Sequence, residues 1–327
     1  MKKFNVTILL LSSLVLVGVI SLIMLLQLDK EPVEKKRIYL IIKTVTENGD
    51  FWSNIVNGAE LAAVELGVDV IIQGPQKELY VDEQIGLVEA IIVEKPVAIA
   101  IAATDYEKLG PVCDKAMEQG IILVTYDSDA LMKNEHSFIA TNNQAASQRL
   151  AHELATLMDG NGKVAIFSHI EGSFTSQERE EGFIKGLKPF EGISIVGDIN
   201  YSDNNSDISY QKAMKVIEQN PDIQALYGTN EATLIGIARA VRDLELQNQV
   251  HVVGFDMSND IAQMIEENII DAAMVQRPFN MGYLAIKEVL EIEDGKDPNV
   301  IDTGAVLINK ENMFLPENQK LIVPNVD

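Results

Sequence analysis

The feature that most constrains the fold is a repeated alternation of short apolar runs with amphipathic stretches. Residues 38–42, 68–72 and 97–102 are short, continuous and rich in branched side chains, which is typical of strands covered on both faces. Between the first two runs, residues 54–66 carry apolar side chains at helical spacing, and Gly67 ends the pattern. Strand–helix–strand repetition with short connections predicts a parallel sheet with helices on both faces.

The same rhythm restarts after Ala140 and continues toward the C-terminus. A chain of 327 residues is long enough for two cores of ordinary size. Two consecutive α/β units therefore predict two lobes, and we expect ligand binding at the carboxyl ends of their strands. The strands expected in the second unit are residues 163–168, 193–198, 225–227, 250–253 and 271–275.

The N-terminus predicts a membrane anchor. Lys2 and Lys3 precede an uncharged run, residues 4–28, which is long enough to cross a hydrocarbon core of about 30 Å as a helix. The run ends without the small residues of a cleavage site, and no cysteine stands there to carry a lipid. An uncleaved signal-anchor puts the rest of the chain on the extracellular or periplasmic side of the cell membrane. The alternative is a cleaved signal that leaves a freely secreted protein.

Net charge and cysteine content exclude several classes of protein. A formal net charge of −23 provides no basic face to release counterions from nucleic acid, and it disfavours docking on anionic lipid. The single cysteine, Cys113, can form neither an internal disulfide nor a multi-cysteine metal site. Its place in a helix-like run predicts a buried side chain.

Motifs for catalysis, metals and cofactors are incomplete. His152 begins a zinc-protease pattern that fails because Thr156 occupies the position of the second histidine. Gly160 and Gly162 precede a strand, whereas a dinucleotide-binding loop follows one. Residues 203–207 begin like a calcium loop but lack its later glycine and glutamate, so we interpret them as a polar loop or helix cap. We therefore predict no catalytic residue, no metal and no cofactor.

Polar side chains directly follow four of the expected strands. They are Asp127, Asn230, Asp256 and Gln276. Because the carboxyl ends of parallel strands meet at one edge of a sheet, we expect these side chains to converge. A sugar requires this combination of carboxylates and amides for its hydroxyls, with aromatic rings against its C–H face. The aromatic candidates near other strand ends are Phe51, Trp52 and Tyr201.

Six short stretches together carry a resemblance to a known family. They are FWSNIVNGA at 51–59, VTYD at 124–127, EREEGF at 178–183, TNE at 229–231, VGFD at 253–256 and QRP at 276–278. With them, nearly all of the chain beyond residue 37 resembles the periplasmic sugar-binding proteins of the ribose/galactose type, whose fold is shared by the ligand domains of the lactose-repressor family.

The resemblance implies two doubly wound parallel-sheet lobes joined by a hinge of three crossings, here preceded by one transmembrane helix. The boundaries expected are 1–36 for the anchor and linker, 37–141 with 277–305 for the N-terminal lobe, and 142–276 with 306–327 for the C-terminal lobe.

The resemblance also implies a role for each candidate. The four polar strand-end residues would bond ligand hydroxyls, and the three aromatic residues would sandwich the ring. The ribose binders carry arginines where this chain has Ser128 and Gln177, and neither replaces the bidentate guanidinium fork. Gln177 remains a candidate ligand residue at its position. The implied ligand is a small sugar or polyol, with a non-sugar polar molecule as the alternative.

A receptor of this type closes by hinge motion on its ligand. Two partners then remain open, the permease of an ABC importer or the ectodomain of a sensor histidine kinase, and the uncleaved anchor favours the second. A DNA-binding repressor with the same ligand fold is disfavoured, because an apolar span stands where a basic helix-turn-helix would be needed. An extracellular hydrolase is disfavoured by the failed motifs.

Overall fold

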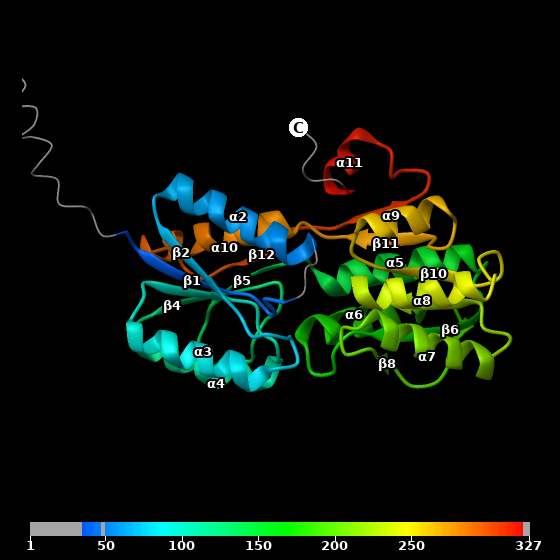
Figure 1. Ribbon diagram of the computed structural model, residues 1–327, viewed down its shortest axis with the longest axis horizontal. Helices are drawn as coiled ribbons and strands as arrows, with labels where there is room; N and C mark the ends of the chain where they lie inside the picture. Colours follow the sequence, from blue (N-terminus) through cyan, green and yellow to red (C-terminus); the bar gives the residue numbers. More distant parts are fainter. Residues whose placement is uncertain (1–34, 47–49, 323–327) are drawn as a thin grey trace, which may run out of the picture. The chain divides into compact units, whose positions relative to one another are not determined.

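The computed structural model describes residues 35–46 and 50–322, which build two β-sheets (Figure 1). The first sheet has the strand order β12-β5-β4-β3-β1-β2, and its neighbouring strands pair in parallel. Its strands are β1 (Arg37–Ile41), β2 (Asp69–Gln73), β3 (Ala98–Ile101), β4 (Ile122–Tyr126), β5 (Ser137–Ala140) and β12 (Val300–Asp302).

The second sheet has the order β13-β11-β10-β9-β6-β7. The short strand β8 pairs with the C-terminal end of β6, on residues that β7 does not reach. Its pairings are parallel except at one edge, where β13 runs antiparallel to β11. The strands are β6 (Asn161–Ser168), β7 (Gly192–Ile195), β8 (Asn200–Tyr201), β9 (Ala225–Gly228), β10 (His251–Phe255), β11 (Ala272–Val275) and β13 (Val306–Asn309).

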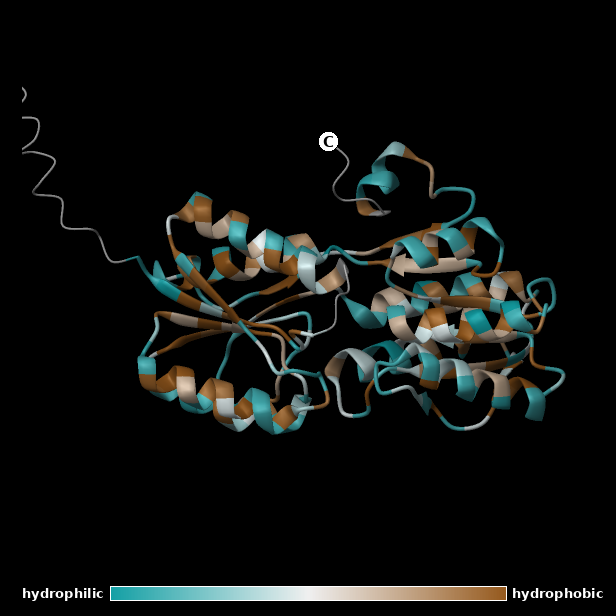
Figure 2. Ribbon diagram, viewed as in Figure 1, coloured by the Kyte–Doolittle hydropathy of each residue, from teal (hydrophilic) through white to brown (hydrophobic). Residues whose placement is uncertain are grey.

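Helices cover both faces of the first sheet. α2 (Asp50–Leu66) packs with α10 (Pro278–Glu293) on one face, and α3 (Val81–Glu94) packs with α4 (Tyr106–Glu118) on the other (Figure 1). The sides of these helices turned to the sheet are apolar (Figure 2), and they form a separate core on each face. Cys113 of α4 belongs to one of these cores, which confirms its predicted burial. Burial raises the pKa of its thiol to about 12.

The second sheet is covered in the same way. One core gathers side chains of α5 and α6, and the other gathers those of α7, α8 and α9. The helices are α5 (Asn143–Leu157), α6 (Phe174–Leu187), α7 (Ser206–Gln219), α8 (Glu231–Asp243) and α9 (Asn259–Glu266), followed near the C-terminus by α11 (Pro316–Ile322).

We call the first sheet with its helices the first lobe and the second sheet with its helices the second lobe. The chain passes between them three times, after β5, after β11 and after β12. The predicted α/β fold with two parallel-sheet lobes is confirmed, and the antiparallel β13 is an addition that the sequence pattern did not indicate. The predicted membrane span, residues 4–28, lies outside the described residues. Within the described ranges, no helix has the length and apolar character needed to cross a membrane.

Two glycines set the close approach of α2 and α10. A Cβ on Gly282 would overlap the carbonyl oxygen of Ile55 in α2, and a Cβ on Gly58 would overlap the carbonyl oxygen of Phe279 in α10. Since backbone stands at both places, no side chain can move aside to make room. This close contact fixes the position of α2, which carries Phe51 and Trp52 in its first turn.

Gly282→Ala should therefore destabilise the protein by about 1–3 kcal/mol, because the added methyl group forces the two helices apart. The measurement is the free energy of unfolding in urea. Gly86→Ala is the matched control, since this exposed glycine of α3 has open space around its Cβ position. The control should gain up to about 1 kcal/mol from the higher helix propensity of alanine. Equal stability of the two variants would contradict the packing argument.

Candidate functional site

A cavity of about 650 Å³ lies at the carboxyl ends of the strands of both sheets. Six of the eight sequence-predicted candidates line it, namely Phe51, Trp52, Asp127, Asn230, Asp256 and Gln276. The first three come from the first lobe, and the other three follow β9, β10 and β11 of the second lobe.

Asp127 and Asp256 occupy equivalent places in the two lobes. Each is the first residue after a central strand, and each has a left-handed backbone, with φ of 57° and 74°. Their amides donate to the carbonyl oxygens of Ile139 and Met274 on the neighbouring strands, both at 2.9 Å. Non-glycine residues in this conformation are concentrated at functional sites, because the surroundings must hold them there. Both carboxylates belong to the cavity lining.

Asp256 lies in a small polar network. Its Oδ1 accepts a hydrogen bond of 2.6 Å from Gln276 Nε2, and its Oδ2 accepts one of 3.1 Å from the amide of Glu231. Burial raises the pKa of Asp256, against the opposing effects of the Arg179 charge and of these hydrogen bonds. Gln276 Oε1 is buried and accepts no hydrogen bond from the described part of the chain. A ligand hydroxyl can supply that missing donor.

Asn230 combines a structural and a site position. Its Oδ1 caps α8 by accepting the amide of Thr233 at 3.1 Å, while its Nδ2 donates to Asn204 Oδ1 at 2.6 Å. Asn204 follows β8 and also lines the cavity. The cap fixes the orientation of the Asn230 amide, so that its donor is directed at Asn204.

Lys43 is a charged residue of the lining that sequence reasoning missed. It follows β1, and its side chain is almost fully buried. The ammonium lies 3.0 Å from Glu78 Oε1 and 3.5 Å from Asp127 Oδ2. Two carboxylates therefore compensate the buried cation within the first lobe. A lysine directly after a buried strand was the available sequence signal.

Arg179 of α6 takes the place that Gln177 was expected to occupy. Gln177 is exposed and does not belong to the described lining, because two residues further along a helix the side chains point to a nearly opposite side. Arg179 is buried in the lining, where its Nε donates to Asn143 Oδ1 at 2.8 Å and its Nη1 to Thr229 O at 2.7 Å. Its guanidinium also lies 4.3 Å from the ring centre of Phe255.

The aromatic half of the predicted site differs from expectation. Phe51 and Trp52 both line the cavity, with ring centres 5.2 Å apart and planes at 88°. Tyr201 of β8 lies outside the described lining, and its hydroxyl is bonded to Glu180 at 3.3 Å. The second lobe instead contributes Ile208 and other aliphatic side chains. Of the three predicted aromatic residues, Phe51 and Trp52 belong to the described lining and Tyr201 does not.

His169 follows β6 and is a buried, neutral member of the lining. Its Nδ1 lies 2.8 Å from Thr229 Oγ1, and its Nε2 lies 3.0 Å from Thr175 Oγ1. Burial, together with the charges of Arg179 and Lys43, lowers its pKa well below the ordinary value.

The segment 203–207 is a helix cap, as predicted. Asn205 Oδ1 accepts the amides of Asp207 and Ile208 at 2.9 and 3.0 Å and so begins α7. Across the residues that the structure describes, no group of three or more His, Cys, Asp or Glu side chains could hold a metal ion.

Two α/β lobes with a polar cavity at their strand ends are typical of solute-binding proteins. A family profile described as a periplasmic binding protein domain matches residues 38–297. The chain belongs to this family, and the predicted resemblance to periplasmic sugar-binding proteins is confirmed.

Relatives of known name cover most of the chain. A D-ribose/D-allose-binding protein of Pseudomonas aeruginosa is 26% identical over 91% of this chain and 94% of its own length. A D-allose-binding periplasmic protein of Escherichia coli is 27% identical, over 78% of this chain and 83% of its own.

Solved structures of sugar-binding proteins share this fold. A carbohydrate transporter solute-binding protein from Agrobacterium radiobacter, in complex with D-arabinose, is 30% identical with a TM-score of 0.84, covering 89% of this chain and 100% of that one. A glucose-galactose binding protein from Geobacillus stearothermophilus is also 30% identical with a TM-score of 0.81, over 86% and 99%.

The pKa of His169 predicts a pH dependence of stability. His169 stays unprotonated in the folded state, whereas the unfolded chain takes up this proton below about pH 6.5. The contribution of His169 to the free energy of unfolding is therefore present above that pH and is lost as the pH falls. The free energy of unfolding should then fall by up to about 1.4 kcal/mol per pH unit through this one proton. His136 and His251 act in the opposite direction, since Asp129 and Asp271 raise their pKa values.

The test therefore compares the native protein with a variant that lacks His169. Urea unfolding between pH 5 and 7.5 should give a free energy for the native chain that falls more steeply toward low pH than that of His169→Gln. Parallel curves for the two proteins would contradict the lowered pKa of His169.

Proposed function

We propose that the protein is a receptor that binds a small neutral sugar or polyol in this cavity and delivers it to an ABC importer, without catalysing a reaction. One observation carries the proposal: carboxylates and amides from both lobes converge there with Phe51 and Trp52. Such groups match the hydroxyls and the C–H face of a sugar. The relatives named above, which bind D-ribose, D-allose or D-arabinose by their names, support the ligand class.

The balance of charges supports a neutral ligand. The described lining contains five carboxylate side chains and three cationic ones, and the buried cation Lys43 already has two carboxylate neighbours. An anionic ligand would meet a cavity whose lining side chains carry more negative than positive charge. A neutral polyol meets no such repulsion.

Ligand binding would use a hinge between the lobes. The proposed lobes are residues 37–141 with 277–305 and residues 142–276 with 306–327. The three chain passages between the sheets support this division. Closure about these passages would enclose the ligand, as in other two-lobed binding proteins.

Uptake and sensing differ in the partner that reads the closed form. A ribose import binding protein of Bacillus subtilis, 26% identical over 80% of this chain, supports uptake through an ABC permease. The sequence of residues 4–28 supports the proposal of a membrane anchor, and an anchored receptor suits a histidine-kinase ectodomain. Deleting the gene for this protein distinguishes uptake from sensing. Loss of labelled-sugar uptake indicates import, whereas loss of a sugar-induced transcriptional response with normal uptake indicates sensing.

The ligand is first identified by a thermal-shift screen against pentoses, hexoses, sugar alcohols and inositols, because a ligand stabilises the state that it binds. Asp127→Ala and Asp256→Ala should then each weaken binding by about 2–4 kcal/mol, since each removes a charge-assisted hydrogen bond from a buried site. Calorimetry measures the change. Gln177→Ala and Tyr201→Phe are controls outside the described lining and should bind normally. Unchanged affinity in both aspartate variants would exclude this cavity as the site.

Charge discrimination gives a second test. The uronic acid of the best hexose should bind at least about tenfold more weakly than the hexose itself, a difference of about 1.4 kcal/mol. Glu231→Gln should reduce the difference in affinity between the hexose and its uronic acid, because it removes one lining carboxylate. The backbone amide of residue 231, which bonds to Asp256, is kept. Tighter binding of the uronate than of the hexose would contradict a neutral ligand.

A further inference from the structure

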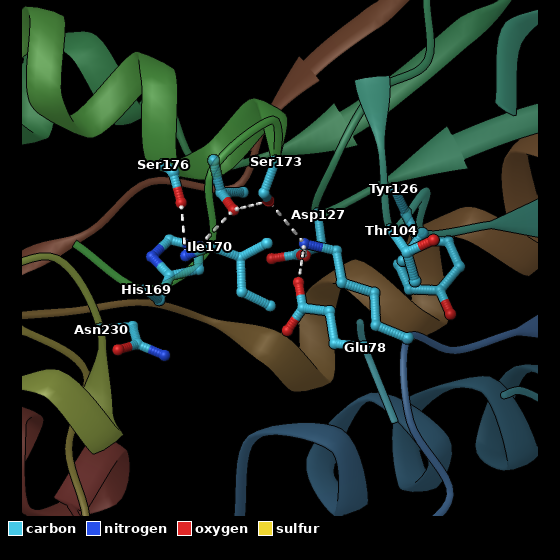
Figure 3. Close-up of polar contacts among 12 residues, drawn as sticks. Glu78, Thr104, Tyr126, Asp127, His169, Ile170, Ser173, Ser176 and Asn230 are labelled. Atoms are coloured by element: carbon cyan, nitrogen blue, oxygen red, sulfur yellow. Dashed lines mark hydrogen bonds and ion pairs between the residues drawn. The ribbon is translucent and has the colours of Figure 1, made fainter. Parts of the chain in front are cut away.

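A file of buried polar side chains connects the two lobes beside the cavity. Lys43 Nζ of the first lobe donates to Ser173 Oγ of the second at 3.3 Å. Ser173 Oγ lies 3.1 Å from Thr175 Oγ1, which lies 3.0 Å from His169 Nε2. Figure 3 shows Ser173 and His169 on one side of this contact and Glu78 and Asp127 on the other.

The file continues inside the second lobe. His169 Nδ1 lies 2.8 Å from Thr229 Oγ1, and Thr229 Oγ1 donates to Ser168 Oγ at 3.2 Å. The amide of His169 also donates to Thr229 Oγ1, at 3.1 Å. All six side chains from Lys43 to Ser168 are buried, with at most 3% of any residue exposed. Buried groups of this kind depend on one another for hydrogen bonds.

The chemistry of the end groups gives the file a single direction. An ammonium can only donate, so the Ser173 oxygen accepts, and its one hydrogen is left for Thr175. The hydrogen of Thr175 then goes to His169 Nε2. At the other end the hydrogen of Thr229 goes to Ser168, so His169 Nδ1 must carry the proton and donate to Thr229.

Ser173 is diverted from its usual role in order to take part. It occupies the N-cap position of α6, where a serine oxygen normally accepts an amide of the first turn, yet it makes no side-chain cap bond. Its oxygen faces the Lys43 ammonium instead. A helix N-terminus is an unfavourable place for a cation, and the two carboxylates on Lys43 offset that repulsion.

We propose that Ser173, Thr175 and His169 form an interlobe latch, which holds the Lys43 ammonium in place and favours the closed arrangement of the lobes before a ligand arrives. The latch rests on the proposed function only in its effect on sugar affinity. A receptor that is already partly closed binds more tightly, because less of the binding free energy is spent on selecting the competent state.

Other interlobe contacts limit the size of the expected effect. Asn204 Nδ2 lies 3.5 Å from Glu78 Oε2, and the amide of Tyr106 donates to Gly172 O at 3.2 Å. Loss of the latch should therefore loosen the closed form without abolishing it. The buried file is distinguished from these contacts by its length, since it joins six buried side chains across the two lobes.

Ser173→Ala removes the link and leaves Lys43 its two carboxylates. Ser176→Ala is the matched control, since it removes another buried hydroxyl of α6 whose bond, from the amide of Ile170, stays within the second lobe. Spin labels on cysteines introduced at exposed Val64 of α2 and Glu218 of α7 report the distance between lobes without any ligand. The native Cys113 does not react, being buried with a pKa of about 12.

Ser173→Ala should shift the distance distribution toward longer values, and Ser176→Ala should leave it unchanged. Thr175→Val, which cuts the file one step further along, should behave like Ser173→Ala if the latter folds poorly. Nitrogen-15 NMR of the native protein should find His169 protonated at Nδ1 and unprotonated at Nε2. Proton on Nε2, or native distances in both Ser173→Ala and Thr175→Val, would overturn the latch.

The effect on binding is measured separately. Ser173→Ala should raise the Kd of the sugar found in the screen about fivefold, mainly through faster dissociation, while Ser176→Ala should not. If the distance and NMR results hold and no sugar binds, the proposed function fails and the latch stands. If sugar binds and Ser173→Ala changes neither distance nor dissociation rate, the latch fails alone.

Discussion

The cavity depends on one backbone constraint at the end of a central strand, which both lobes share. Directly after the central strands β4 and β10 the chain enters the left-handed region, at Asp127 and Asp256, while the amide still bonds to the next strand. A non-glycine residue is held in this conformation at a cost of about 1–3 kcal/mol. In return, two carboxylates from opposite sheets belong to one cavity, and Lys43 and Gln276, which bond to them, also line it.

The two lobes compensate these carboxylates differently. In the first lobe a buried ammonium, Lys43, stands between Asp127 and Glu78. In the second, Asp256 is bonded to the neutral amide of Gln276 and to a backbone amide, and the nearby Arg179 is engaged by Asn143 and Thr229. The buried carboxylates of each lobe thus have partners within the protein, and the proposal of a neutral ligand rests on this compensation.

Sequence patterns predicted the residues that follow strands, because a strand's end can be located from its apolar run and parallel strands share one edge. Asp127, Asn230, Asp256 and Gln276 all belong to the lining for that reason. The pattern could not give the rotation of a helix to within one or two residues, so Gln177 was chosen where Arg179 points inward. Nor could it give partners distant in sequence, such as Lys43 with Ser173, which only the fold brings together. Tyr201 lies outside the described lining, and its hydroxyl bonds to Glu180, which the sequence pattern could not show.

The position of Trp52 gives the protein a built-in optical signal. It is the single tryptophan of the chain, and it lies in the cavity wall at the start of α2, in edge contact with Phe51. A change in the polarity or hydration around its ring therefore appears in an indole emission to which no other site of the chain contributes. Occupancy can be followed in the unlabelled native chain by fluorescence, on the timescale of mixing, whatever solute the cavity accepts.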